Sequence, residues 1–325
     1  MRSWLLIAIA LLSSARVHTA PPRDVIVDHD GGVDDLIAIA LLMKSPDVHV
    51  RAIGICPADS YLDPATRATQ LFVERLGGRD ITIAQGHAEG TNPFPADWRN
   101  DAARVLGIKA LVGAQPSRDN PVVADDAAHH LVKLLSGERV YTILETGPLT
   151  NIADALKINP SIKRNITRIY AMGGAVRVRG NVDQRGHDGS AEWNFFNQPL
   201  AASDVMRAGI PVTLVPLDVT NNVPLTRSFV ARLAAQSSVA SQLASQAWQI
   251  ATQDPSNPYY FWDTLTAAAL LDPSIVKTEP LKIRVVTSGG SQGRTVEDSR
   301  GARVDVALDA SRQKVERMFL DLLAR

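Results

Sequence analysis

The stretch VIVDHDGGVDDLIAIALLM, residues 25–43, places four carboxylates between two apolar runs. The short β-branched run predicts a strand, and the longer run from DDL onward predicts a helix that follows it. Asp28, Asp30, Asp34 and Asp35 fall within eight residues of one another. Carboxylates have a reference pKa near ~3.9 and repel one another when they are crowded. The stretch therefore predicts a strand-helix unit whose acidic cluster needs a compensating partner.

The same alternation of short β-rich runs and longer helical runs continues along most of the chain. The β-rich runs include VHVRAIGI (48–55), VYTIL (140–144), RIYAM (168–172) and VTLVPL (212–217). The helical runs include PATRATQLFVERLGG (64–78), PLTNIADALKI (148–158) and PLAASDVMRAG (199–209). This rhythm predicts an α/β fold with an open, mainly parallel, Rossmann-like sheet that has helices on both faces.

The C-terminal part departs from this alternation. Residues 225–273 are mostly helical in pattern, LKIRVVTSG (281–289) and GARVDVAL (301–308) predict a terminal β pair, and residues 311–325 predict an amphipathic helix. No internal repeat or long linker marks a domain boundary. We therefore expect one domain over residues 21–325 with a helical C-terminal elaboration.

The first twenty residues have the composition of a secretory signal peptide. Arg2 precedes the apolar run WLLIAIALL (4–12), and small residues follow in SSARVHTA (13–20). The run is too short to span a bilayer. A buried N-terminal strand or helix is the alternative, but the run stops at PPRD, which resembles the start of a mature chain. We expect cleavage after Ala20 or Ala15, a secreted or periplasmic protein, and no membrane association afterwards.

The composition argues against nucleic-acid and membrane partners and against a disulfide framework. Lys plus Arg equals Asp plus Glu at 34 each among 325 residues, so no global field attracts nucleic acid or an anionic membrane. The single cysteine, Cys56, excludes an intramolecular disulfide framework. Asn165 begins a glycosylation acceptor pattern that matters only where the host is eukaryotic and the site is exposed.

Polar residues follow the predicted strands at the positions where those strands end. In an open α/β sheet the ligand crevice lies beyond the carboxyl ends of the parallel strands. Five segments are expected to meet there, marked by Asp28 with Asp30, Asp59, Thr146, Gly173 with Gly174, and Asp218. The sequence thus predicts a site at this edge.

A bound hard cation would compensate the acidic cluster. The start of a helix favours Asp34 and Asp35 there by roughly 0.3–1 kcal/mol each, but it does not explain four carboxylates. An all-oxygen donor set without His or Cys spacing indicates Ca²⁺ or Mg²⁺. An EF-hand is excluded because its last ligand would fall at Ile39, and a phosphatase-type aspartyl nucleophile is weaker because Gly32 replaces the usual Thr or Val.

At this point the residues resemble a family. The segment DHDGGVDDLIAIALL (28–42) is similar to the Asp-rich N-terminal motif of the nucleoside hydrolases, Ca²⁺-dependent enzymes that cleave the N-glycosidic bond of ribonucleosides. The resemblance continues, in the expected order, through ETGPLTNIADAL (145–156), IYAMGGAV (169–176), GSAEWNFFNQPLAA (189–202) and YYFWDTLTAAALLDP (259–273).

The resemblance implies roles for particular residues. The implied Ca²⁺ ligands are Asp30, Asp35, the backbone carbonyl of Thr146, and Asp263, and Asp30 is also the implied general base. The implied ribose-binding residues are Asp34, Asn181, Glu192 and Asn194. These residue types suit the chemistry, because carboxylates stabilise an oxocarbenium-like state and amides pair with sugar hydroxyls.

The residues expected to contact the nucleobase differ from those of the inosine-uridine type of the family. That type has a His directly before the last Asp ligand, where this chain has Trp262. The segment GTNPFPADWRNDA (90–102), with Phe94 and Trp98, resembles the aromatic loop of the purine-specific inosine-adenosine-guanosine type, in which two tryptophans sandwich the purine. Trp98 and Trp262 are our candidates for that catalytic stacking, although an aromatic residue is more often core. EWN (192–194) matches the same type and adds Trp193 to the substrate-binding candidates.

Some residues remain open or are discounted. Asp59 contacts the base or ribose, or only caps the following turn. His29 is expected to pack behind the acidic cluster, because side chains alternate in an extended segment. Residues 179–190, which include His187, form a lid or a plain mobile loop. Cys56 is expected to be a packing residue.

Three functions follow. The leading one is an exported, Ca²⁺-dependent, purine-preferring ribonucleoside hydrolase that acts on a small-molecule substrate. The first alternative is a broadly specific or pyrimidine-preferring hydrolase. The second is a noncatalytic exported protein that binds nucleoside or Ca²⁺. A homo-oligomer, dimer or tetramer, is expected by analogy with the family alone.

Overall fold

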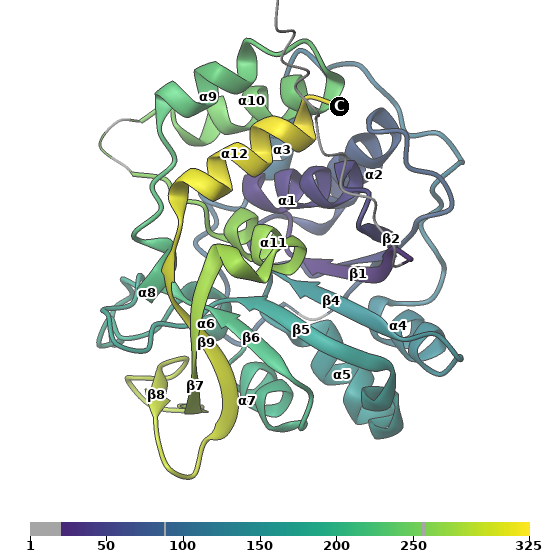
Figure 1. The fold of residues 1–325 in the computed structure, drawn as a ribbon. Helices are drawn as coiled ribbons and strands as arrows, with labels where there is room; N and C mark the ends of the chain where they lie inside the picture. Colours follow the sequence, from purple (N-terminus) through teal and green to yellow (C-terminus); the bar gives the residue numbers. More distant parts are fainter. Residues whose placement is uncertain (1–20, 88, 255, 257) are drawn as a thin grey trace, which may run out of the picture.

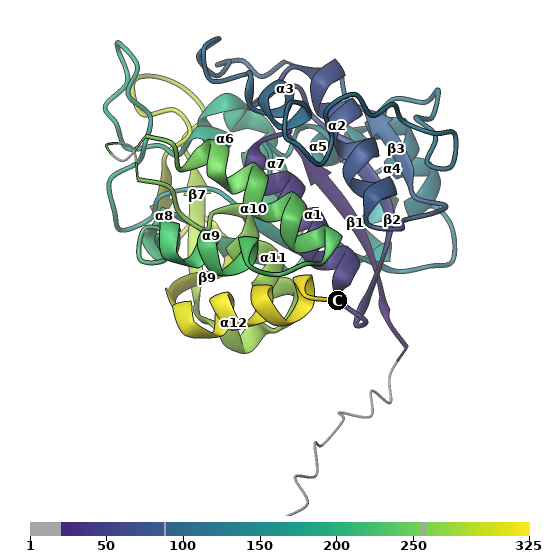
Figure 2. The same cartoon turned by 90° about the horizontal axis from the view of Figure 1, so that it is seen from above.

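The chain forms a nine-stranded sheet in the order β3-β2-β1-β4-β5-β6-β9-β7-β8. The computed structural model describes residues 21–87, 89–254, 256 and 258–325, so the expected signal peptide lies outside the described residues. The strands, shown in Figure 1 and for β3 in Figure 2, are β1 (Arg23–His29), β2 (Val48–Ile55), β3 (Thr82–Gln85), β4 (Tyr141–Glu145), β5 (Ile166–Met172), β6 (Val212–Val215), β7 (Val276–Val285), β8 (Thr295–Glu297) and β9 (Ala302–Ala310).

Strand direction confirms the open, mainly parallel sheet that the sequence predicts. From β3 through β9 every neighbouring pair is parallel. Strands β7 and β8 close the far edge in antiparallel pairing, as expected for a terminal β pair.

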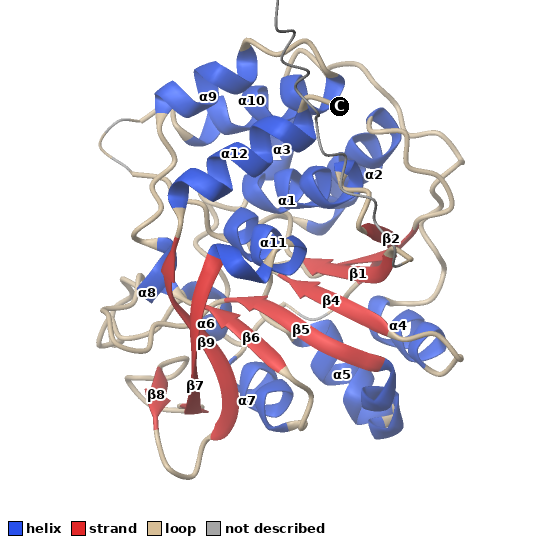
Figure 3. Ribbon diagram, in the orientation of Figure 1, coloured by secondary structure: helices blue, strands red, loops and turns tan. Residues whose placement is uncertain are grey.

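Helices cover both faces of the sheet (Figures 1, 2 and 3). One face carries α1 (Val33–Lys44), α2 (Leu62–Arg75), α3 (Asp101–Leu106), α9 (Arg227–Ala234), α10 (Val239–Ala251), α11 (Asp263–Leu271) and α12 (Arg312–Leu323). The other face carries α4 (Ala127–Leu135), α5 (Thr150–Ile158) and α7 (Pro199–Arg207). The short helices are α6 (Trp193–Asn197) and α8 (Leu217–Thr220), with 3₁₀ turns at Pro160–Asn165 and Pro273–Ile275.

Helix α1 occupies the centre of the larger helical layer. It packs on α10, α11 and α12, and residues 33–42 are all buried. An apolar helix that is covered all round needs no polar stripe, which explains the uninterrupted run in the sequence. Among the described residues, no helix is long and apolar enough to cross a membrane.

The strand order positions the site. Strand β1 lies between β2 and β4, and from β1 the chain order runs outward in both directions. Such a switch point opens a crevice between the loops at the carboxyl ends of the two central strands. Asp30 follows β1 and Thr146 follows β4, so both residues lie at this crevice.

Candidate active site

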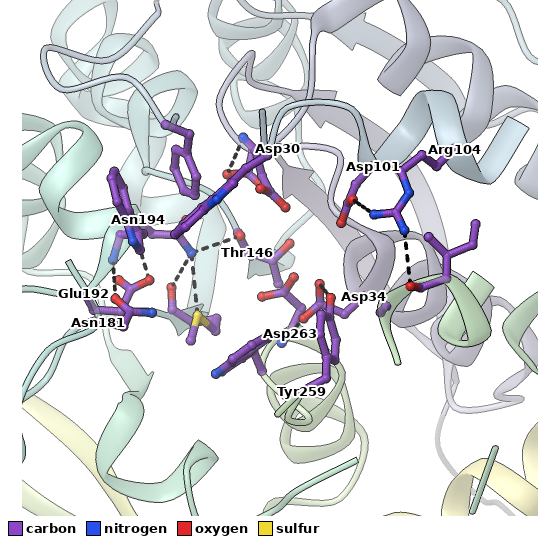
Figure 4. A pocket seen from close by; sticks show the side chains of 18 of the residues that line it. Asp30, Asp34, Asp101, Arg104, Thr146, Asn181, Glu192, Asn194, Tyr259 and Asp263 are labelled. Carbon is purple, nitrogen blue, oxygen red and sulfur yellow. Dashed lines mark hydrogen bonds and ion pairs between the residues drawn. The ribbon is translucent and has the colours of Figure 1, made fainter. Parts of the chain in front are cut away.

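A pocket of about 570 Å³ lies at the carboxyl edge of the central strands. Asp34, Asp263 and Tyr259 lie on one side of it, and Asn181, Glu192 and Asn194 on the other (Figure 4). Every candidate residue but one lines it: Asp30, Asp34, Asp59, Phe94, Trp98, Thr146, Asn181, Glu192, Trp193, Asn194, Trp262 and Asp263. The exception, Asp35, is buried directly behind the wall, where the Thr146 Oγ1 donates to its Oδ1 over 2.5 Å.

The first turn of α1 arranges the acidic cluster. Gly32 forms its N-cap, and the Gly32 N–H donates to Asp35 Oδ2 over 2.7 Å. Asp34 Oδ2 accepts from the backbone N–H of Asp263, which begins α11. The N-termini of α1 and α11 thus meet at the acidic cluster. Their first backbone N–H groups have no partner within the helix and favour the negative charge of the cluster.

Burial shifts the pKa values of these carboxyls upward. Burial, followed by the charges of Asp35 and Asp59, raises the pKa of Asp30 well above its usual range. Burial and the charge of Asp34 raise the pKa of Asp35 to about 7. Burial, followed by the charge of Asp34, also raises the pKa of Asp263 well above its usual range. Crowded carboxyls of this kind ionise together only when a cation offsets their repulsion.

The donor set fits a hard divalent cation. The carboxyls meet in pairs, Asp30 with Asp35 and Asp34 with Asp263. In the described part of the chain, no three acidic, imidazole or thiol groups already converge on one point. The carboxylates and the Thr146 carbonyl are all oxygen donors, which suits Ca²⁺ or Mg²⁺, and Ca²⁺ tolerates irregular geometry better.

A second group of polar side chains faces the acidic cluster. Glu192 caps α6, and its carboxylate accepts from the N–H groups of Asn194, Phe195 and Gly174. Burial raises the pKa of Glu192 to about 7, against the effect of these donors. The Asn194 amide donates to the Thr146 carbonyl over 3.1 Å. A carboxylate acceptor, Glu192, and an amide donor, Asn194, therefore lie close to Thr146.

The aromatic candidates lie in two separate groups on the pocket wall. Trp98 contacts Trp193 edge-on, with ring centroids 5.3 Å apart, and Phe94 lies 4.9 Å from Trp193. Trp262 packs against Tyr259 at 4.6 Å. Trp98 is 50% exposed. The structure thus brings both predicted tryptophans to one pocket, each packed against a different partner.

Asp59 lies in the loop between β2 and α2 and faces the pocket. Its N–H donates to Asp30 Oδ2 over 3.3 Å, whereas the N-cap of α2 is Tyr61. These positions favour a ligand-contacting role over the capping role. The position of Asp59 also explains why residue 32 is a glycine, because a Cβ there would collide with the Asp59 carboxylate.

Sequence reasoning missed several polar residues of the pocket wall, among them Tyr259, Asp101 and Arg104. The Tyr259 hydroxyl donates to Asp34 Oδ1 over 2.9 Å. Arg104 forms a 3.2 Å ion pair with Asp101 and donates to the Ile250 carbonyl at the end of α10. The signal for Tyr259 was its position in the same motif as Trp262 and Asp263.

The discounted histidine and cysteine lie where the sequence places them. His29 is buried, accepts from the Gly31 N–H and contacts Thr69, so it packs behind the acidic cluster as expected. Burial lowers its pKa to about 3, which keeps the ring neutral. Cys56 is buried beside the pocket wall.

Residues 179–190 are tied to the loop after β7. The Asp188 N–H donates to the Gly290 carbonyl over 2.8 Å, and the His187 ring contacts the Gln292 carbonyl at 2.9 Å. Gln292 in turn donates to Asn92 over 3.1 Å. These contacts join residues 179–190 to two neighbouring loops.

Two other polar positions have local structural roles. Asn165 is buried and donates to the Gly137 carbonyl, which disfavours glycosylation there. Asp218 follows β6 as expected, but its carboxylate accepts from the N–H groups of Val176 and Arg177, and it does not line the pocket.

Comparison with known proteins identifies the family. Residues 25–317 match the family described as inosine-uridine preferring nucleoside hydrolase. A pyrimidine-specific ribonucleoside hydrolase of Shewanella woodyi is 31% identical over 93% of this chain and 97% of its own length. A non-specific ribonucleoside hydrolase of Escherichia coli is 29% identical over 92% and 98%. The solved inosine-uridine preferring nucleoside hydrolase of Bacillus anthracis is 37% identical, with a TM-score of 0.87 over 93% of this chain and 99% of that one. This chain belongs to the inosine-uridine preferring nucleoside hydrolase family.

Proposed function

We propose that this chain is a Ca²⁺-dependent ribonucleoside hydrolase that releases free base and ribose. The observation that carries the proposal is the arrangement of the pocket, which has buried carboxylates on one side and Glu192 with two amides on the other. The family supports hydrolysis of the N-glycosidic bond. A pocket of about 570 Å³ is large enough for a nucleoside.

The residues divide the chemistry between them. The Asp30 carboxylate takes a proton from the attacking water as the water oxygen bonds to C1′. Positive charge develops on the ribose ring as the C1′–N bond breaks, and its electron pair leaves with the base, which takes a proton from solvent. Asp34 and Glu192 stabilise that charge and accept from ribose hydroxyls, and Asn181 and Asn194 complete the sugar contacts.

Asp30, Asp35, Asp263 and the Thr146 carbonyl would hold Ca²⁺. When bound, the ion lowers the pKa of the water that is to be activated. It also offsets the repulsion among carboxyls whose pKa values burial raises.

We propose a base preference that includes pyrimidines. The proteins described above are pyrimidine-specific, non-specific or inosine-uridine preferring, and Trp98 and Trp262 each pack against another aromatic residue. A purine preference is the second candidate, since aromatic rings from two segments line the same pocket.

The test is ribose release by residues 21–325 from inosine, adenosine, guanosine, uridine and cytidine, with Ca²⁺ or with chelator. We expect chelator-sensitive release from uridine as well as from purine nucleosides. Release from purine nucleosides alone would establish the purine preference. No release from any nucleoside by a Ca²⁺-loaded protein would instead support the noncatalytic binding function.

We also propose export by the N-terminal signal. N-terminal sequencing of protein recovered from its native host should begin at residue 21 or 16. An intact Met1 on the accumulated protein would contradict export by cleavage.

A further inference from the structure

Glu145 is a buried carboxylate that the proposed reaction does not use. It is the last residue of β4 and is 1% exposed. Its Oε1 accepts from the N–H of Gly147 over 3.0 Å and from the N–H of Leu149 over 3.3 Å. One carboxylate oxygen thus binds two backbone donors of the turn that follows it.

That turn has a demanding conformation. Leu149 has φ +61° and ψ 12°, in the left-handed region that side-chain-bearing residues rarely adopt. The Thr146 N–H donates to the Asp28 carbonyl over 2.9 Å, which fixes the start of the turn. A chain in this conformation persists only where surrounding contacts hold it, and Glu145 supplies two of them.

The turn lies directly against the acidic cluster. A Cβ at Gly147 would lie 3.2 Å from the Cβ of Asp30. The Thr146 side chain reaches Asp35, while its carbonyl accepts from Asn194. A displacement of the turn would therefore move the Thr146 carbonyl relative to the carboxylates.

Glu145 forms a buried pair with a second carboxyl, that of Asp28. Glu145 lies beside Asp28 in the parallel register of β1 and β4. The Asp28 carboxylate accepts from the Asn151 amide over 2.8 Å. On the next strand stands Gly54, where any Cβ would collide with Asp28. Three segments thus enclose a buried polar layer at the carboxyl end of β4.

We propose that Glu145 is a positioning residue that fixes the Thr146 carbonyl for cation binding by holding the N–H groups of Gly147 and Leu149. The proposal rests on the proposed function, because it assigns Glu145 to the same cation site. The positioning of the Thr146 carbonyl depends on a side chain long enough to bring an acceptor oxygen to these N–H groups, and not on the charge of the carboxylate.

Two conservative variants separate reach from charge. Glu145→Asp keeps the charge but shortens the side chain by one methylene, whereas Glu145→Gln keeps the length and an acceptor oxygen but removes the charge. Ca²⁺ affinity is measured by titration calorimetry without nucleoside. We expect Glu145→Asp to weaken it by about tenfold or more, and Glu145→Gln to stay within about threefold of the wild type.

The opposite pattern, with Glu145→Gln weakened and Glu145→Asp unaffected, would show that charge matters and would overturn the proposal. Equal affinities in both variants, or equal losses, would also overturn it. If Glu145→Asp does not fold by circular dichroism, the threefold limit for Glu145→Gln decides alone.

Asp218 provides the matched control, because its carboxylate also accepts two backbone N–H groups beyond a neighbouring strand. We expect Asp218→Ala to leave Ca²⁺ affinity unchanged. An equal loss of Ca²⁺ affinity in Asp218→Ala would show that any disturbance of the loops at the carboxyl edge of the sheet weakens binding, and would overturn the proposal. Absence of Ca²⁺ binding by the wild type would instead refute the cation site of the proposed function, and the role of Glu145 with it.

Discussion

The Tyr259 hydroxyl donates a hydrogen bond to the Asp34 carboxylate over 2.9 Å. This contact joins the chain before α11 to the first turn of α1, 225 positions away in the sequence. Both side chains line the pocket. Burial is the main cause that raises the pKa of the Tyr259 hydroxyl well above its usual range, so the phenol keeps its proton at neutral pH. The contact fixes the carboxylate of a proposed ribose-binding residue before substrate arrives.

Removal of this hydroxyl should weaken substrate binding. In Tyr259→Phe, Asp34 loses a donor while the ring stays in place, and we expect kcat/KM to fall by about ten- to a hundredfold, since a hydrogen bond to a charged group contributes roughly 1.5–3 kcal/mol. Steady-state kinetics on inosine and uridine would measure this. Tyr260→Phe is the matched control, since Tyr260 packs on Trp262 but does not line the pocket. An unchanged kcat/KM in Tyr259→Phe would contradict a role for the contact.

Loss of the proposed general base should lower turnover by several orders of magnitude. Asp30→Asn preserves shape but removes the proton acceptor, and we expect kcat to fall by about 10²–10⁴-fold while the variant still binds nucleoside in equilibrium dialysis. Asp24→Asn, at the other end of β1 and paired with Arg51, should keep kcat within about twofold. Retained turnover in Asp30→Asn would exclude the proposed base.

The two tryptophans should report base preference. Stacking contributes roughly 1–3 kcal/mol per base. If both rings stack on purines, Trp98→Ala and Trp262→Ala should each lower kcat/KM for inosine by about tenfold and spare uridine. The ratio of the two substrates serves as the internal control. Equal losses on uridine would be inconsistent with selective purine stacking and would favour a broadly specific pocket.

Buried carboxyls should make the Ca²⁺-free protein less stable as pH rises. Burial raises the pKa of Asp28 to about 6 and those of Asp35 and Glu192 to about 7. Their unfolded values lie near ~4, so the folded state binds more protons between pH ~4 and 7. The resulting stabilisation is fully present below pH ~4 and is lost as pH rises through 6 to 7.

Thermal unfolding from pH 5 to 8, with chelator or with Ca²⁺, would test this expectation. Ca²⁺ competes with protons for the carboxylates, so the increase in Tm on adding Ca²⁺ should grow with pH. A Tm increase that is independent of pH, or larger at pH 5, would contradict the assignment of Asp35 to the cation site.

The positions of the acidic residues were predictable from the sequence because parallel strands impose them. Asp30 and Thr146 directly follow strands that pair in register, so the sheet brings them together without any knowledge of side-chain packing. The same reasoning places Asp59 at this edge. Helical periodicity likewise predicted the elaboration over 225–273, where α9, α10 and α11 lie.

Contacts that depend on loop paths were not predictable in this way. Tyr259 reaches Asp34 only because α11 packs on α1, which no local pattern encodes. Asn165 matched an acceptor triplet, yet its side chain is buried, because the turn before β5 folds toward Gly137. The partners of Trp98 and Trp262 depend on two segments whose paths no periodicity fixes.

The ties among residues 92, 187 and 292 have a consequence for how this pocket can diverge. They join three loops into one wall beside Asn181 and Glu192, the residues assigned to the sugar. Residue 92 belongs to the segment 90–102 that also carries Trp98, whereas Trp262, the other candidate for base stacking, comes from the chain between α10 and α11, which those ties do not include. Substitutions at Trp262 can therefore accumulate and alter the choice of nucleobase across descendants without breaking the contacts among residues 92, 187 and 292.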